Sequence, residues 1–239
     1  MADLVQIWFE QATKLSYSGR FTMKSDKQLQ QDVMDDLRWD PSIDASKIGV
    51  TASNAVITLT GSVPSYFQKQ NTERIVKRVA GVRAVANDIE VRLPSSTERN
   101  DGDIALAAVN ALKWDTSVPD EQVKVSVSKG WVTLEGNVDW NYQRESCEKV
   151  VEKLVGVKGV TNRLAVAPHV KSKDVKSEIK AALHRYAELE ARNIEVDSAD
   201  SSVTLRGQVR SWAERKEAES AAWMAPGVTQ VKNEIIVSV

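Results

Sequence analysis

The residues of this 239-residue chain that could perform catalytic or metal chemistry are few and scattered. The two histidines, His169 and His184, have no cysteine or acidic cluster at metal-ligand spacing, so we expect no metal site. The single cysteine, Cys147, excludes an internal disulfide, and we interpret it as a small, partly buried packing residue. No GxSxG, Walker or HExxH motif is present. The sequence therefore predicts a protein that is not an enzyme and needs no cofactor.

Charge provides one candidate binding feature. Lys173, Lys176 and Lys180 fall on one face of a predicted helix, opposite Val175 and Ile179. A solvated surface stripe is the ordinary interpretation. Contact with anionic lipid head groups is the functional alternative, in which each lysine contributes about 1 kcal/mol. The formal net charge of −1 argues against bulk attraction to nucleic acid.

A threefold internal repeat determines how these residues are positioned. A glycine followed two residues later by valine occurs at Gly61, Gly136 and Gly207. Apolar residues at i, i+4 and i+8 before each glycine indicate a helix, and two alternating β-branched runs indicate a hairpin. A second helix and a last strand follow the glycine. Twenty residues after it comes a second glycine, and six residues later an asparagine, namely Gly81, Gly156 and Gly227 with Asn87, Asn162 and Asn233.

Each repeat is therefore predicted to be αββαβ, and the fold class to be α+β. We expect three tandem units, each with two helices on one face of a small three-stranded mixed sheet. The first glycine of each repeat is expected to end a strand at a sharp turn, and the second to cap a helix at positive φ. The asparagine is expected to bond to the backbone at the start of the last strand. The predicted helix N-caps are Ser25, Asp103 and Ser172.

The predicted domains are residues 25–93, 101–167 and 171–239, preceded by an N-terminal extension, residues 1–24. Apolar residues at helical spacing between Leu4 and Leu15 predict a short amphipathic helix in the extension. This helix is expected to pack on a repeat or on a neighbouring subunit, or to insert into a membrane interface.

Several aromatic residues stand at repeated positions. We interpret Trp39-Asp40 and Trp114-Asp115 as a helix-ending aromatic residue followed by a turn aspartate. The aromatic residues that follow the first glycine are expected to pack between repeats, with insertion into a membrane interface as the alternative. They are Tyr66, Trp140 and Trp212.

Two shared segments carry a family resemblance. The first reads Val/Ile-Thr-Leu-x-Gly-x-Val, and the second begins at the second glycine and reads Gly81-Val-Arg-Ala-Val-Ala-Asn87-Asp-Ile89-Glu-Val91 in the first repeat. With both segments in all three copies, each unit resembles a BON domain. The resemblance implies bacterial origin, an association with osmotic or envelope stress, and binding to phospholipid membranes. Related domains also occur in envelope ring and channel assemblies. Many relatives are exported and typically carry two copies.

Peripheral binding to anionic phospholipid or to an envelope assembly is therefore the expected function, with Lys173, Lys176 and Lys180 as the contact set. The alternative is a homo-oligomeric scaffold or pore-like ring joined through the N-terminal helix and the sheet edges. Gly156 and Gly159 match the GxxG of KH domains, but this segment precedes a strand, so nucleic acid is not an expected partner. The sequence lacks a secretory signal and an apolar run of spanning length. We expect a cytoplasmic protein that can lie at a membrane surface, or a periplasmic one if the chain is a processed form.

Overall fold

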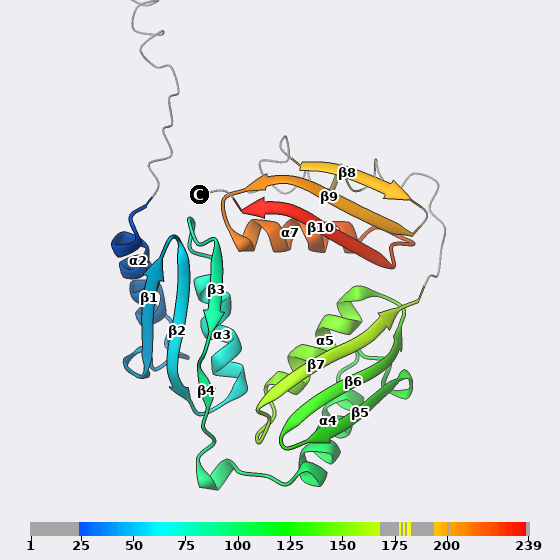
Figure 1. The fold of residues 1–239 in the computed structure, drawn as a ribbon. Helices are drawn as coiled ribbons and strands as arrows, with labels where there is room; N and C mark the ends of the chain where they lie inside the picture. The colour runs from blue at the N-terminus through cyan, green and yellow to red at the C-terminus, as the bar shows by residue number, and fades with distance from the viewer. Residues whose placement is uncertain are drawn as a thin grey trace, which may run out of the picture.

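The computed structural model describes residues 24–167, 177, 179, 181, 182, 194–199 and 201–237. Within these residues the chain forms three units, each with its own small sheet and its own hydrophobic core (Figure 1). The predicted α+β fold of three αββαβ repeats is confirmed. The helix predicted between Leu4 and Leu15 lies outside the described residues.

The units share one order of elements. The first contains α2 (Asp26–Trp39), β1 (Ile48–Ser53), β2 (Val56–Val63), α3 (Tyr66–Val76), β3 (Ala84–Asn87) and β4 (Glu90–Val91). The second contains α4 (Asp101–Trp114), β5 (Val123–Ser128), β6 (Trp131–Val138), α5 (Asn141–Glu152) and β7 (Gly159–Val166). The third contains β8 (Ile194–Ala199), β9 (Ser202–Val209), α7 (Trp212–Trp223) and β10 (Gln230–Val237). Before β8, residues 177, 179, 181 and 182 are helical.

In each sheet the middle strand pairs antiparallel with the first strand and parallel with the last. Strand alternation buries Ile57 and Leu59 completely, while Thr60 of the same strand is exposed. The buried side meets the predicted helix stripe, of which Leu29 and Val33 are at most 1% exposed. We call the other side, which carries Thr60, the open sheet face.

The first glycine of each repeat is required by a close approach of the backbone. Gly61 lies inside β2, opposite Ile48, with φ of 113°. A Cβ atom there would stand 2.1 Å from the carbonyl oxygen of Lys47. In the second unit, a Cβ atom on Gly136 would stand 2.0 Å from the carbonyl oxygen of Gln122. The prediction that this glycine ends a strand was wrong, because the strand continues for two more residues.

The asparagine bonds to the backbone, as predicted, and also ties the last strand to the second helix. It does not lie at the start of the last strand, because Asn87 ends β3 and Asn162 is the fourth residue of β7. Asn87 Oδ1 accepts from the backbone N–H of Ile89 at 3.3 Å, and Asn87 Nδ2 donates to Glu73 of α3 at 2.8 Å. The other two copies repeat both interactions, Asn162 with Leu164 and Glu148, and Asn233 with Ile235 and Glu219.

The first helices are capped and clamped at their N-termini. Ser25 caps α2, as predicted, by accepting from Gln28 N. The prediction of Asp103 was wrong, because Asn100 caps α4 and accepts from Asp103 N at 2.8 Å. The cap predicted at Ser172 lies outside the described residues. The first carboxylate of each helix then accepts two backbone N–H groups of the β-hairpin turn, Asp26 from Asn54 and Ala55 and Asp101 from Lys129 and Gly130.

The three second helices, α3, α5 and α7, face one another between the units (Figure 1). The last strands of the sheets lie toward this centre, and the first strands, β1, β5 and β8, form the outer edges. The side chains on the second helices therefore decide how the repeats associate.

Candidate binding surfaces

The first residue of each second helix is buried or partly buried at the centre. Tyr66 of α3 is 8% exposed and belongs to the core of the second unit. Trp212 of α7 packs against the core of the first unit. The prediction that the aromatic residues after the first glycine pack between repeats is confirmed for these two, but Trp140, which precedes α5, is 36% exposed. Asn141 stands at the same position of α5 and is 5% exposed.

Ion pairs connect α5 to both neighbouring second helices. Arg74 of α3 pairs with Glu152, whose side chain is only 6% exposed. Lys216 of α7 pairs with Glu145 at 3.0 Å. Burial raises the pKa of Glu145, but the ammonium group of Lys216, together with Lys149, lowers the pKa by more, so that it lies below the usual value. The acidic helix α5 is thus held by cations from both sides.

Cations also cover the two tryptophans of α7. Lys77, which follows the end of α3, stands 6.0 Å from the centre of the Trp212 ring, and Arg144 of α5 stands 4.9 Å from that of Trp223. The start of α7 therefore meets the end of α3, and the start of α5 meets the end of α7. The start of α3 meets the end of α5. There, burial raises the pKa of the Tyr66 hydroxyl, and the negative charge of Glu152 adds a smaller increase.

These head-to-tail contacts close upon themselves after three units. When head-to-tail contacts between units close into a ring, each unit uses both of its contact surfaces within the ring. The second-helix surfaces are therefore occupied within the chain, and candidate binding surfaces must be sought on its outside.

Two tryptophans stand out among the exposed residues. Trp39 is 90% exposed and Trp114 is 86% exposed, and each is the last residue of a first helix. The following aspartates are turn residues, as predicted. Asp40 accepts from the backbone and side chain of Ser42 at 2.9 and 2.6 Å, and Asp115 accepts in the same way from Ser117. The backbone beside each indole ring is thus fixed, while the ring itself lies in solvent.

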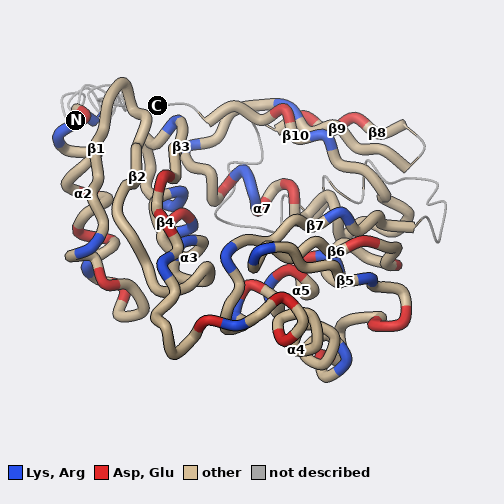
Figure 2. Tube along the Cα trace, turned by 60° about the horizontal axis from the view of Figure 1, so that its bottom comes forward, with Lys and Arg blue, Asp and Glu red and all other residues tan. Residues whose placement is uncertain are grey.

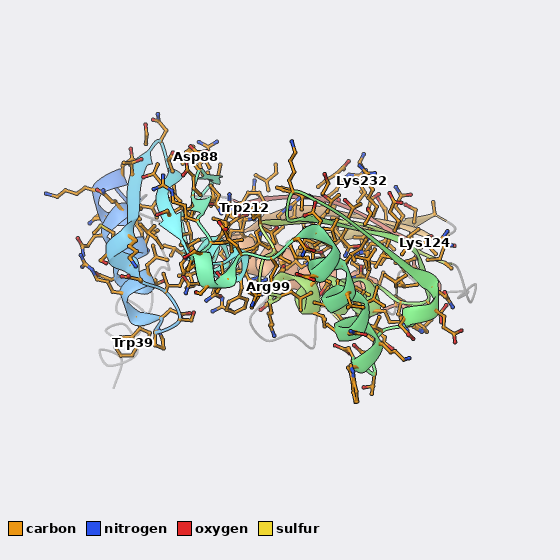
Figure 3. All side chains as sticks on the ribbon, turned by 90° about the horizontal axis from the view of Figure 1, so that it is seen from below. Trp39, Asp88, Arg99, Lys124, Trp212 and Lys232 are labelled. Atoms are coloured by element: carbon orange, nitrogen blue, oxygen red, sulfur yellow. The ribbon has the colours of Figure 1, made fainter. Side chains whose placement is uncertain are left out.

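Both tryptophans lie on the side of the molecule opposite the open sheet faces. Figure 3 labels Trp39 at its lower edge, and Lys124 and Lys232, which lie on strands of two sheets, toward its upper side. Trp114 is the last residue of α4, the helix of the second unit that is equivalent to α2. We call the surface that presents Trp39 and Trp114 the tryptophan face.

Charges of both signs are interspersed along the described chain (Figure 2). Next to Trp39, Arg38 pairs with Asp35 at 3.3 Å, and Asp32 and Asp36 lie on the same helix. The surface around Trp39 is therefore not basic. The lysines of the sequence-based contact set, Lys173, Lys176 and Lys180, lie outside the described residues, as do His169 and His184.

The remaining candidates for chemistry have structural roles. Cys147 is fully buried, whereas the sequence predicted only partial burial. Burial raises the pKa of its thiol to about 11. The GxxG segment leads into β7, where a Cβ atom on Gly159 would stand 2.4 Å from the ring of Trp131. Among the described residues, no group of three or more His, Cys, Asp or Glu side chains could hold a metal ion. None of the helices described is both long and apolar enough to cross a membrane.

The repeated glycines, the clamped hairpins and the asparagine bridges define one domain type. A family profile described as "BON domain" matches residues 25–92, 100–168 and 171–238. The chain belongs to the BON domain family. Osmotically-inducible protein Y of Escherichia coli (strain K12) is 33% identical to this BON protein over 127 residues. The match covers 52% of this chain and 63% of that relative, so it spans less than two thirds of the relative's length.

Two solved structures show remote similarity to this BON protein. CdsD, a structural protein of the type III secretion system of Chlamydia trachomatis, is 12% identical, with 86% of this chain and 90% of that chain covered and a TM-score of 0.24. For the C-terminal domain of CdsD the identity is 13%, the coverage 90% and 100%, and the TM-score 0.25. TM-scores this low support no argument about function.

Proposed function

We propose that this BON protein is a non-enzymatic, stress-associated bacterial protein that binds peripherally to phospholipid membranes. The family and the name of its osmotically inducible relative support the association with stress. The observation that carries the membrane contact is the pair of nearly fully exposed tryptophans, Trp39 and Trp114, at equivalent positions of two repeats.

An indole ring has an apolar body and one N–H donor, which suits it to the boundary between water and lipid. Leaving two such rings in water at fixed positions gives the folded chain no stability. Insertion at an interface would remove their apolar area from water at about 25 cal/mol per Å². Because the helix ends beside them are fixed by Asp40 and Asp115, little conformational entropy is lost on insertion.

Anionic lipid would be recognised by the lysine stripe of the third repeat, Lys173, Lys176 and Lys180. The contributions of the tryptophans and the lysines to binding can be separated by their response to salt. Binding through tryptophan should persist in salt, whereas binding through lysine should weaken with salt.

Co-sedimentation of the full chain with vesicles tests the proposal. Vesicles of phosphatidylcholine alone, and vesicles with phosphatidylglycerol added, should both bind the protein, the second more tightly and with greater salt dependence. The double variant W39A/W114A should bind roughly tenfold less. Trp131→Ala provides a matched control, because Trp131 lies on the open sheet face and is 50% exposed. Equal binding by the double variant and the wild type would refute the tryptophan contact.

A homo-oligomeric scaffold remains the second candidate function. One specific observation favours it, namely the uncovered outer edge of the second sheet. Association through this edge would not require the membrane contact.

A further inference from the structure

The outer edge of the second sheet differs from the outer edges of the other two. Among the strands that the structure describes, β5 pairs with β6 alone. Its core-facing residue Val125 is only partly buried, whereas the equivalent residues Val50 and Val196 are 7% and 1% exposed. Val123 and Val127 of β5 are partly buried as well. The apolar side of this edge strand is therefore incompletely covered by its own unit.

The first unit covers its edge with a glutamine. Gln30, the fifth residue of α2, donates through Nε2 to the carbonyl oxygen of Val50 at 2.6 Å. This hydrogen bond shows that the Val50 carbonyl points away from β2. Val125 has the same register in its own sheet, so its carbonyl also points outward. The fifth residue of α4 is Ala105, whose methyl group cannot donate a hydrogen bond.

The apolar surface beside this edge continues onto α4. Val109 follows Ala105 by four residues, so both lie on the side of α4 that faces the edge. Val109 is 51% exposed and its neighbour Leu106 is 64% exposed. At the position of Val109 the first unit has Met34, which packs against the first core. The second unit therefore presents an open strand edge and an apolar helix side together.

We propose that this surface binds a second copy of the chain, with β5 pairing antiparallel with β5 of the other copy about a twofold axis at Val125. This register places Val123 opposite Val127 of the other copy, and Val125 opposite Val125 of the other copy. Each valine pair can exchange backbone N–H and C=O groups, because these groups point outward at alternate residues. The two sheets would then form one continuous sheet, and Val109 and Leu106 of the two α4 helices would lie against each other.

Charge supports a second copy as the occupant. The one charged residue of β5 is Lys124, and the twofold register places it opposite Ser126 of the other copy. Like charges directly opposite each other are destabilising in antiparallel sheets, and this register avoids them. The same operation on β8 would place Glu195 opposite Asp197. Strand β1 has its edge carbonyl occupied by Gln30. Among the outer edges, β5 alone is both uncovered and compatible with its own copy.

Sedimentation equilibrium of the full chain tests this interface through the dissociation constant of the dimer. Ser126→Lys would place a lysine opposite Lys124 of the other copy at two places in the interface, so the constant should rise roughly tenfold. Ser126→Glu would place opposite charges there and should not weaken the dimer. Thr51→Lys is the matched control, because Thr51 has the equivalent position on the covered strand β1, and it should change nothing.

Ala105→Gln provides a second, independent variant. It places the edge-covering glutamine of the first unit beside Val125 and should also weaken the dimer. Circular dichroism and thermal melting identify any variant that fails to fold. If either S126K or A105Q does not fold, the dissociation constant of the other variant tests the interface. A monomer at every concentration, or equal effects of S126K and T51K, would overturn the proposal, as would a dimer unchanged by both S126K and A105Q. The W39A/W114A variant should dimerise normally, which separates this interface from the membrane contact.

Discussion

Arg74 of α3 and Glu152 of α5 form an ion pair between the first and second repeats, in which the carboxylate is almost completely buried. The two residues are far apart in the sequence and occupy different positions of their repeats. Their pairing fixes the orientation of one unit against the next. It joins the last turns of α3 and α5, and it is one of the contacts through which α3, α5 and α7 associate.

Replacing Arg74 by alanine should destabilise the association of the first two repeats. The change leaves the Glu152 carboxylate buried without its partner, and since the Arg74 side chain is 40% exposed we expect a loss of about 1–2 kcal/mol. Urea denaturation followed by tryptophan fluorescence measures the loss. The double variant R74A/E152Q should recover part of it. Additive effects of the two single changes would contradict a direct interaction.

Replacing Trp212 by alanine should release the third repeat from the first. The indole ring packs against the core of the first unit and is flanked by Lys77 and Arg215. Hydrogen exchange should increase in α3 and α7, and the unfolding transition of the third unit should move to lower temperature by several degrees. Tyr142→Ala, at a residue 56% exposed on α5, is the control and should leave exchange unchanged. Protection unaltered by W212A would exclude the contact.

Replacing Gly136 by alanine should be strongly destabilising. The new Cβ atom would meet the Gln122 carbonyl at 2.0 Å, and φ of 131° is strained for any residue with a side chain. We expect a loss of about 3 kcal/mol or more, measured by thermal or chemical denaturation. Gly102→Ala, near the start of α4, is the control: its Cβ atom would stand 3.2 Å from Oδ1 of Asn100, a contact that a small shift of the side chain relieves, so the loss should be far smaller than that of G136A. Equal stability of G136A and the wild type would show that β6 tolerates a side chain there.

Cys147 should react slowly with thiol reagents while the protein is folded. Its pKa is raised to about 11 by burial, so the thiol is protonated and inaccessible at pH 8. Reaction with a disulfide reagent should be at least about 100-fold slower than in denaturant, where one thiol per chain should titrate. Rapid labelling of the native protein would place Cys147 at the surface instead.

Stability should fall in acid in part through Asp26. Hydrogen bonds from the backbone N–H groups of Ala55 and Asn54 lower the pKa of Asp26 below its usual value. A carboxylate with a lowered folded-state pKa stabilises the fold above its unfolded pKa, and this contribution disappears as pH falls through the folded-state value. Asp26→Asn should therefore lower the melting temperature at pH 7 and reduce its further fall below about pH 4. Asp35→Asn, on the same helix, is the control, because Asp35 accepts from side chains alone. An identical pH profile for D26N and the wild type would rule out the clamp.

Much of each repeat follows from local patterns in the sequence. The i, i+4, i+8 spacing of Leu29, Val33 and Leu37 predicted a buried helix face, and all three are at most 1% exposed. The repeat also predicted the strands, the turn aspartates and the backbone role of the asparagines. These features depend on residues close in sequence and on periods of 3.6 and 2, so a single chain displays them without a structure.

The sequence alone did not place Gly61, which faces the Lys47 carbonyl from inside a strand, because that contact requires the register of β1 against β2. It favoured packing of Trp212 between repeats but left membrane insertion open, and it did not predict that Trp39, at a helix end, is 90% exposed. The association of the units depends on Tyr66 and Trp212, each the first residue of its second helix, whereas the second unit has Asn141 at that position of α5. Such contacts join distant segments through the shapes of complete units, so only the tertiary structure decided which surfaces the chain occupies itself and which it leaves for partners.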